Sequence, residues 1–481
     1  MGTLVQVYVE PTKSESATPL PSKVMKKSNR KSLESSSSSA SSSYPHHSNQ
    51  RTMTLGTFLG YGIYNPNSLY RVRILCHATL HPHLTKSLSN MVSTSNQMST
   101  ASLSSQLVMK ILHHHISSAW NLRQTILFHP KKTTTTTPTT TAYRWINGEG
   151  DGLSGLAVDI LDSWIVVMSS ASWCEIFRTE IETVLQDIQS QSLTMDQHRN
   201  DGIIWKQSLR RLHQDGCKST KTTTTMTKTT TTTITNTMDD PPTTMNQSVI
   251  IRENNILFRT YPFQDGQKTG FYCDQRDNRL YFAQQYCHNK RVLDLFCFQG
   301  GFSLAAKVLG GAMHCTGVDS SQTAIDACWE NAKLNHLTDM TFLRDDVEQF
   351  LSKAKDSIPS QSWDVIILDP PKLAPTVSGL ERASRKYHSL NRDAIRLINP
   401  KHGGILVSCT CSAAMSQKDG GTYFVQMIQQ AAIAAGRHVT LLRTTGASIC
   451  HTQNPACHPA GSYLTAAWFH VSPAMDNGQM E

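Results

Sequence analysis

Two glycines and two aspartates stand at the spacing of a nucleotide-binding site. Gly300 and Gly301 lie between a β-rich run, 291–296, and an amphipathic segment, so they form the turn from a strand into a helix. Such a turn lets the backbone approach a ligand closely, and the helix N-terminus offers free N–H donors. Asp294 lies in the first strand, and Asp319 ends the second, where a carboxylate can accept hydrogen bonds from both ribose hydroxyls. The spacing predicts a site for a ribose-bearing ligand.

The pattern by itself leaves that ligand open. The GxGxxG fingerprint of dinucleotide-binding proteins is absent, because the two glycines are adjacent and an acidic residue sits inside the first strand. Proteins that bind NAD and proteins that bind S-adenosylmethionine share the carboxylate at the end of the second strand. An ordinary nucleotide fold without either role is the alternative.

Two further acidic motifs follow later strands. Asp345 and Asp346 end the third strand, where a carboxylate can accept from an adenine amino group; Asp346 is the first choice and Asp345 the second. Asp369 opens the sequence DPPK, in which two prolines fix φ at about −65° and remove two backbone donors. This gives a rigid, carbonyl-lined edge beside the reacting group, although Asp369 could also simply cap the strand.

Alternating strands and helices must position these residues. From residue 290 onward, strands are predicted at 291–296, 314–319, 341–344, 364–369 and 404–410, and helices at 302–309, 322–335, 381–398 and 423–435. Repeated βα units predict an α/β fold with a parallel, doubly wound sheet and the ligand at the carboxyl ends of its strands. A helix is also expected over 104–128, with its histidine run, 113–115, in solvent.

The motifs DLFCFQGGFS, GVDSS, FLRDDV, DPPK and LVSCTCS, in this order, resemble those of class I S-adenosylmethionine-dependent methyltransferases. The chain is most similar to the bacterial ribosomal RNA large subunit methyltransferase I family, which makes 5-methylcytosine. The resemblance continues upstream through QDGQKTGFYCDQRDNR and INGEGDGLSGLAVDI, similar to the family's connecting domain, and GTFLGYGIYNPNSLYRVRIL, similar to the end of its PUA domain. It implies a Rossmann-like seven-stranded methyltransferase sheet, S-adenosyl-L-methionine as cofactor, and RNA, above all large-subunit ribosomal RNA, as partner.

The resemblance also implies domain boundaries. Residues 1–9 and 53–76 would form a partial PUA-like RNA-binding β domain, residues 100–260 a small α+β connecting domain, and residues 261–473 the methyltransferase domain. Three Ser/Thr-rich stretches, 10–52, 131–141 and 218–245, are predicted to be disordered inserts, because they cannot bury enough apolar area to offset their ordering entropy. The earlier PUA residues have no counterpart, so we expect an upstream start of translation.

The family's functional positions correspond to individual residues of this chain. The resemblance implies cofactor binding by Asp294, Phe296, Gly300, Gly301, Asp319, Asp345, Asp346, Asp369, Gln275 and Arg276. It implies catalysis by Cys411, which matches the family's nucleophile, and we expect Asp369 and Lys372 to assist on chemical grounds. Cys409 has no counterpart and is expected to pack in the core.

A cysteine suits methylation at carbon 5 of cytosine, because that carbon is a poor nucleophile. Attack of a thiolate on carbon 6 makes an enamine that can take a methyl group, after which the carbon 5 proton and the thiolate leave. Lys372 could lower the thiol pKa or pair with a phosphate, and Asp369 could hydrogen-bond the base. Many RNA cytosine-5 methyltransferases carry a second cysteine after the proline of the DPPK-like motif, which this chain lacks, so the base that takes the proton is unassigned.

Other functions stay open beside this one. A guanine N7 methyltransferase needs no nucleophile, because the ring nitrogen attacks directly, and Cys411 argues against it. A non-catalytic RNA-binding protein that retains the fold would have lost Asp319, the glycine turn or Cys411, and all are present. An amino methyltransferase normally has an aromatic residue after D/N-P-P to stack on a flipped base, where this chain has Lys372.

Composition adds little to these assignments. The net charge is +9, yet residues 251–481 carry 22 basic and 20 acidic side chains, so charge is weak support for an RNA partner. No run of roughly 18 apolar residues occurs, which excludes a spanning helix and predicts a soluble, intracellular protein of the cytoplasm or an organelle. Twelve cysteines without a CxxC pair predict a reducing compartment, and no metal site is expected at the Cys-His pairs 450–451 and 457–458. A homodimer is one option for the assembly.

Overall fold

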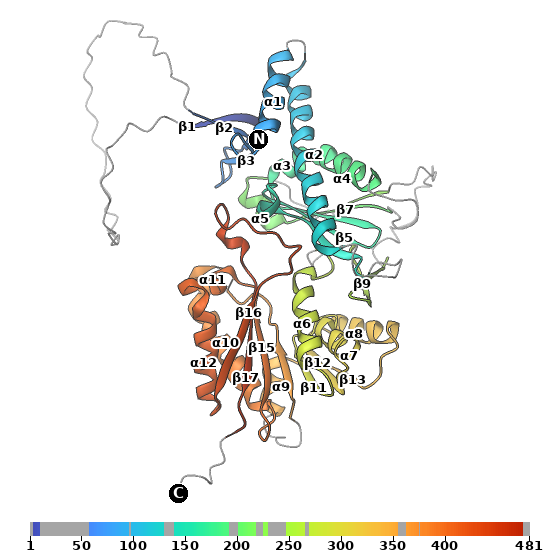
Figure 1. Cartoon of the computed structure of the whole chain (residues 1–481), viewed down its shortest axis with the longest axis vertical. Helices are drawn as coiled ribbons and strands as arrows, with labels where there is room; N and C mark the ends of the chain where they lie inside the picture. The colour runs from blue at the N-terminus through green and yellow to red at the C-terminus, as the bar shows by residue number, and fades with distance from the viewer. Residues whose placement is uncertain are drawn as a thin grey trace, which may run out of the picture.

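The computed structural model describes residues 3–9, 57–95, 98–128, 139–191, 201–217, 225–228, 247–264, 269–354, 362–374 and 376–474. Three parts follow one another along the long axis of the molecule (Figure 1). They are a small N-terminal sheet with a helical hairpin, a connecting domain, and a C-terminal α/β domain.

The N-terminal sheet joins segments that are far apart in the sequence. β1 (Thr3–Val9) pairs antiparallel with β2 (Thr57–Tyr64), which pairs with β3 (Val72–His77). A hairpin of α1 (Pro82–Thr94) and α2 (Thr100–Leu127) leads on to the connecting domain. The helix expected over 104–128 is confirmed by α2, whereas the assignment of the sheet to a PUA-like domain stays a prediction.

One of the three adjacent histidines of α2 is buried. His115 lies three, four and seven residues after Leu112, Ile111 and Val108, so it belongs to the same apolar face of the helix. Its Nε2 lies 2.6 Å from the carbonyl oxygen of Leu75 on β3, and burial lowers its pKa to about 4. The expectation of solvent exposure is therefore wrong for His115 and correct for its two neighbours. A neutral imidazole ties α2 to the N-terminal sheet.

The connecting domain is a five-stranded sheet with helices packed on it. Its strand order is β4 (Ala142–Asn147), β5 (Leu156–Leu161), β6 (Trp164–Ser169), β7 (Gly202–Gln207) and β8 (Thr225–Lys228). Neighbouring strands are antiparallel except β6 and β7, which are parallel. The helices are α3 (Ser172–Ile176), α4 (Arg178–Gln191), which packs against α2, and α5 (Leu209–Gln214).

The three expected inserts fall mostly outside the described residues. This holds for all of 10–52, for 131–138, and for 218–245 except four residues. Those four, Thr225–Lys228, form β8 at the edge of the sheet, so the disorder expected over 218–245 is wrong there. Threonine has a high β-propensity, and the edge of β7 offers hydrogen-bonding partners, so a short Thr-rich segment can pair without a core of its own.

The C-terminal domain confirms the predicted doubly wound sheet of seven strands. The strand order is β13 (Met340–Arg344), β12 (His314–Asp319), β11 (Arg291–Leu295), β14 (Val365–Leu368), β15 (Gly404–Thr410), β17 (Thr465–Val471) and β16 (Val439–Thr445). The first five are parallel, and β17 runs antiparallel to both of its neighbours. The carboxyl ends of β11 to β15 therefore meet at one edge of the sheet.

Helices cover both faces of this sheet (Figure 1), because successive strand residues point to opposite sides. Val292 and Leu293 of β11, for example, belong to two different hydrophobic clusters. One cluster includes residues of α6 (Arg276–Tyr286), α7 (Gly301–Val308) and α8 (Gln322–Leu334). The other includes residues of α9 (Val347–Ala354), α10 (Leu380–Leu397) and α12 (Thr422–Ala434), and the short α11 (Ala413–Ser416) follows β15.

A buried ion pair fastens a two-stranded hairpin to this domain. Glu253 ends β9 (Val249–Glu253), which pairs with β10 (Ile256–Thr260), and accepts two hydrogen bonds of 2.7 Å from Arg279 of α6. The two side chains are only 2% and 6% exposed. Arg279 also packs beneath the glycine turn, since a Cβ placed on Gly301 would lie 3.1 Å from Arg279 Cδ. The pair thus supports the turn from below.

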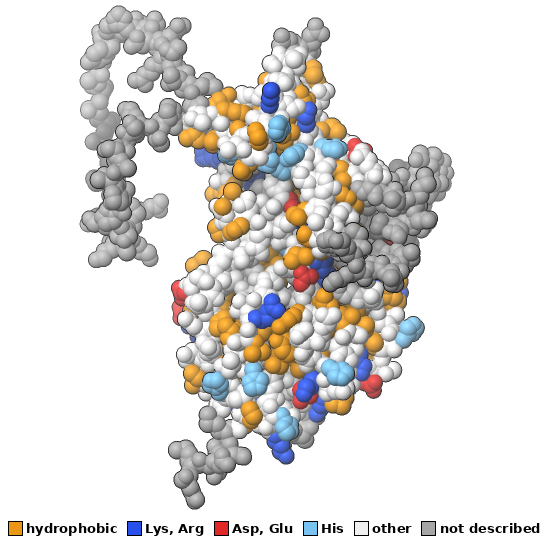
Figure 2. Space-filling model, in the orientation of Figure 1, with side chains coloured by type: hydrophobic (Ala, Val, Ile, Leu, Met, Phe, Trp, Pro, Cys, Tyr) orange, Lys and Arg blue, Asp and Glu red, His pale blue; other side chains and the backbone are white. Residues whose placement is uncertain are grey.

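Charges are mixed on the surface of the C-terminal domain. On the face seen in Figure 2, Lys and Arg side chains are scattered among Asp and Glu, and hydrophobic side chains gather in the middle. The edge strand β16 contributes exposed apolar residues, Leu441 and Leu442. Among the helices that the structure describes, none is both long and apolar enough to cross a membrane.

The substitution Glu253→Gln should lower the free energy of unfolding by about 3 kcal/mol, because it leaves the buried guanidinium of Arg279 without a counter-charge. Urea denaturation measures the effect. The matched control is Glu381→Gln, whose pair with Arg385 is 85% and 70% exposed and should contribute less than about 1 kcal/mol. Equal losses in the two variants would contradict a supporting role for the buried pair.

Candidate active site

The turn after β11 is a compact loop with several left-handed residues. Phe296, Phe298 and Gly300 have φ values of 64°, 49° and 79°, and such values are uncommon outside glycine. The left-handed φ of Gly300 favours glycine, and a Cβ there would also lie 2.7 Å from Leu304 Cδ1. The N-terminus of α7 consequently opens directly at the carboxyl edge of the sheet.

The side chain of Asp294 lies beneath this turn and is not exposed at the edge of the sheet. Its Oδ2 accepts hydrogen bonds from the backbone N and the Oγ of Ser303, at 3.0 and 2.7 Å, and the residue is 1% exposed. Burial raises the pKa of Asp294 to about 6, and the bonds from Ser303 oppose that rise. Asp294 therefore holds α7 against β11, a supporting role for a residue expected to bind cofactor.

Asp319 lies beside the turn at the end of β12. Its Oδ2 accepts from the backbone N of Phe298 at 3.1 Å, and its Oδ1 accepts from Ser321 at 2.9 Å. The residue is half-buried, so its carboxylate is fixed at the edge while part of it faces outward. The backbone N of Asp345 donates to the Asp319 carbonyl oxygen at 3.1 Å, which brings the third strand end to the same place.

The two acidic residues after β13 have different contacts. Asp346, the first choice for adenine, accepts through Oδ1 from the backbone N of Glu348 and of Gln349, at 3.0 and 3.1 Å, and thereby caps α9. Asp345 pairs with Lys353 at 2.9 Å. Both lie at the predicted edge, and one Asp346 oxygen is engaged by the helix cap.

Gln275 and Arg276, where α6 begins, were both predicted to bind the cofactor. Of these two described residues, only Gln275 contacts the DPPK motif. Gln275 Nε2 donates to Asp369 Oδ2 at 3.0 Å, so Gln275 lies at the edge as expected. Arg276 instead donates to Ser448 Oγ at 2.5 Å and to its neighbour Asp277 at 3.1 Å. The described contacts of Arg276 are thus with the loop 446–464 and not with the glycine turn.

Asp369 is a half-buried residue whose carboxyl group has an altered pKa. Burial, followed by the charge of Asp274, raises its pKa to about 7, although the bond from Gln275 opposes this. Lys372 is exposed on the loop that follows Asp369. Near neutral pH, Asp369 can therefore either donate or accept a proton.

The two cysteines of the LVSCTCS motif differ in their surroundings. Cys409 is fully buried within β15, and burial raises the pKa of its thiol well above the usual value. Cys411 follows the last residue of β15 and is half-buried. Among the described residues, Cys411 is therefore the thiol of this motif that a substrate can reach.

Two tyrosines that the sequence analysis overlooked lie close to Cys411. Burial, followed by the charges of Asp274, Cys411 and Asp369, raises the pKa of Tyr272 to about 12, which places these groups near one another. Tyr387 of α10 shares a 2.8 Å hydrogen bond with Thr410 Oγ1, just before Cys411. Tyr272 belongs to the segment FYCDQR, and the resemblance of that segment to the family could have identified it.

A loop from the C-terminal domain, 446–464, reaches the connecting domain (Figure 1). Tyr463 donates to Asp274 Oδ2 at 2.7 Å, and Arg123 of α2 donates to the Cys450 carbonyl oxygen at 2.8 Å. The two Cys-His pairs of this loop are separated: Cys450 is buried, with its Sγ 3.4 Å from His451 Nδ1, whereas Cys457 is exposed. The loop thus links the site to α2.

Known proteins match most of the chain. Residues 241–431 match the model of an S-adenosylmethionine-dependent methyltransferase family. Ribosomal RNA large subunit methyltransferase I of Enterobacter sp. is 33% identical over 326 residues, which cover 67% of this chain and 73% of the relative. The Escherichia coli O157:H7 protein of the same name is 33% identical over 325 residues, again 67% of this chain and 73% of the relative.

Solved structures share the fold. A protein described as an S-adenosylmethionine-dependent methyltransferase from Streptococcus mutans has a TM-score of 0.61 at 18% identity, over 86% of this chain and 88% of that one. A protein described as a methyltransferase in complex with S-adenosylhomocysteine has a TM-score of 0.61 at 20% identity, over 86% and 89%. With the fold shared and curated relatives at one third identity, the resemblance is confirmed, and the chain belongs to the ribosomal RNA large subunit methyltransferase I family of S-adenosylmethionine-dependent methyltransferases.

Proposed function

We propose that this protein methylates carbon 5 of a cytosine in large-subunit ribosomal RNA through a covalent bond to Cys411. One observation carries the proposal. The half-buried thiol of Cys411 follows β15 at the sheet edge where Asp369 lies, and both groups raise the pKa of Tyr272. The curated relatives, named for ribosomal RNA, support RNA as the substrate. Methylation at guanine N7 and RNA binding without catalysis are the alternatives, and neither requires a thiol.

The residues at the edge fit S-adenosylmethionine, the cofactor of this family. Asp319 offers a carboxylate to ribose hydroxyls, and the α7 N-terminus lies beside it. Gln299, within the turn, has a buried Oε1 without a hydrogen-bond partner among the described residues, so an acceptor there suits a donor on the ligand. When bound, S-adenosylmethionine supplies an electrophilic methyl group to carbon 5.

The chain's own residues prepare the cytosine for that transfer. The Cys411 thiolate forms a bond to carbon 6, and the electron pair of the ring double bond becomes available at carbon 5. After methylation a base takes the carbon 5 proton, the pair returns to the double bond, and the carbon–sulfur bond to Cys411 breaks. Asp369, with its raised pKa, donates a hydrogen bond to N3 in its protonated form and so favours thiolate attack. Lys372 is assigned to a phosphate of the RNA.

Replacing the thiol should abolish the covalent step. We expect wild-type protein to form a complex with RNA containing 5-fluorocytosine that survives denaturing electrophoresis, and Cys411→Ser to form none. Methyl transfer to ordinary RNA should fall roughly 10³-fold. The control is Cys457→Ser, an exposed cysteine of the 446–464 loop. A complex that persists in Cys411→Ser would remove Cys411 from this role.

Asp369 should produce a falling limb in the pH profile of methyl transfer. Its folded pKa is raised to about 7, so the donating carboxylic acid is present below that pH and is lost as pH rises through it. In Asp369→Asn the amide donates at every pH, and the limb should disappear while the maximal rate drops. Single-turnover kinetics measure both quantities. A limb unchanged in the variant would assign it to another group.

Asp319→Ala should weaken S-adenosylhomocysteine binding by roughly 10- to 100-fold, the range for hydrogen bonds to a charged group. Isothermal titration calorimetry measures this without any RNA. The control is Asp326→Ala, an exposed carboxylate on α8 that should leave the affinity unchanged. Equal affinity in wild type and Asp319→Ala would contradict the assigned cofactor site.

A further inference from the structure

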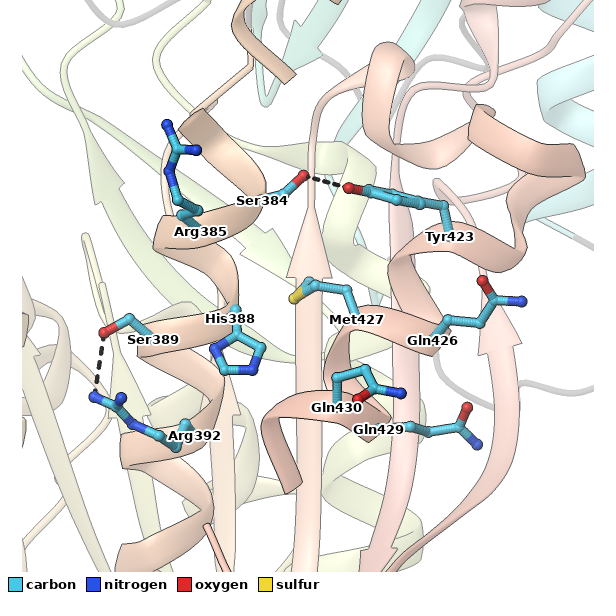
Figure 3. Close-up of a pocket in the computed structure, with 10 residues that line it drawn as sticks. All are labelled: Ser384, Arg385, His388, Ser389, Arg392, Tyr423, Gln426, Met427, Gln429 and Gln430. Atoms are coloured by element: carbon cyan, nitrogen blue, oxygen red, sulfur yellow. Dashed lines mark hydrogen bonds between the residues drawn. The ribbon is translucent and has the colours of Figure 1, made fainter. Parts of the chain in front are cut away.

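A hollow runs between α10 and α12, outside the site described above (Figure 3). Its lining residues include Arg385, His388 and Arg392 from α10, and Tyr423, Gln426 and Gln430 from α12. Tyr423 OH donates to Ser384 Oγ at 3.0 Å and bridges the two helices at one end. Polar side chains come from both helices, and Met427 of α12 adds an apolar side chain to the lining.

We propose that this groove binds the phosphate backbone of the RNA strand beside the target nucleotide. The inference rests on the proposed function, because it assigns a second contact surface to the same RNA. Proteins hold single strands in grooves that combine basic side chains with polar and aromatic groups, and phosphate contacts supply most of the affinity.

Charge favours this occupant. α10 carries five basic and two acidic residues, a net charge of +3, whereas all of residues 251–481 carry only +2. The facing helix α12 has no charged residue, so its wall presents no carboxylate that would repel a phosphate. Two of the five basic residues, Arg385 and Arg392, line the groove, and its lining includes no acidic residue.

The two arginines are spaced to act together. Arg385 and Arg392 are seven residues apart, which is two helical turns or about 10.5 Å along the same face of α10. Among the described residues, Arg385 pairs with Glu381, and so exposed an ion pair contributes little to stability. Arg392 shares the carboxylate of Asp393 with Arg396. Both guanidiniums can therefore turn to phosphates at small cost.

One end of the groove lies toward the candidate active site. Tyr387 lies on α10 between the lining residues Ser384 and His388, and its hydroxyl contacts Thr410, next to Cys411. α12 begins shortly after α11, which follows Cys411. In Figure 3 the bridge between Ser384 and Tyr423 marks one end of the groove, and Arg392 lies at the other. A strand whose base reaches Cys411 can continue between these helices.

The test compares two double variants for RNA affinity. Arg385→Gln with Arg392→Gln removes two charges from the groove, whereas Lys333→Gln with Lys401→Gln removes two exposed charges near the opposite edge of the sheet. The probe is a fluorescein-labelled, unmodified transcript of large-subunit ribosomal RNA, followed by anisotropy over a KCl series. We expect the groove variant to bind about tenfold more weakly, with the slope of log K against log[KCl] reduced by about 1.4, as for two single-strand phosphate contacts. S-adenosylhomocysteine affinity should be unchanged in both.

Several outcomes would overturn the groove assignment. One is equal affinity in the two double variants. Another is a groove variant that keeps its RNA affinity but changes from dimer to monomer in light scattering, since the groove would then hold a second copy. Failure of the wild type to bind the transcript would overturn both the groove and the RNA substrate. A covalent complex retained by Cys411→Ser would overturn only the proposed cysteine chemistry.

Discussion

The active-site edge depends on the buried ion pair of Glu253 and Arg279. The Arg279 guanidinium bonds to Glu253 of the β9–β10 hairpin and to the Tyr272 carbonyl oxygen, and its stem packs under Gly301. One side chain thus fixes three segments: the hairpin, the residues that lead into Gln275, and the glycine turn. Because a buried charge without its partner is costly, these segments keep their mutual positions only while the pair is intact.

The site itself has two halves with different origins. Asp319 and the glycine turn come from consecutive βα units, and the parallel sheet brings them together. The half that we propose for catalysis collects Asp369, Cys411 and Tyr272 from separate segments, and Tyr463 of the loop 446–464 contacts Asp274. Burial in this second half raises the pKa of Asp369. It also raises the pKa of Cys409, which is fully buried, whereas Cys411 is half-buried.

The sequence was sufficient to predict the features that depend on residues close together in the chain. Strand periodicity and the glycines predicted the five parallel strands and the position of Asp319, because both follow from neighbouring residues, whereas the seven-stranded sheet was implied by the family resemblance. The contact of Tyr463 with Asp274 spans 189 positions and that of Arg123 with Cys450 spans 327, so no periodicity could reveal them. Arg276 shows the same limit, since its partner Ser448 lies 172 positions away. The burial of His115 could have been found, because it lies on the apolar face of its helix.

The pairing of β1 with β2 across residues 10–56 has a consequence for how such chains vary in length. The entropy of closing a flexible connection grows only with the logarithm of its length, by about 0.6 kcal/mol for each doubling. An antiparallel pair can therefore tolerate large insertions between its strands in the sequence. Such insertions lengthen the polypeptide while the strand register, and with it the distant candidate site, stays unchanged.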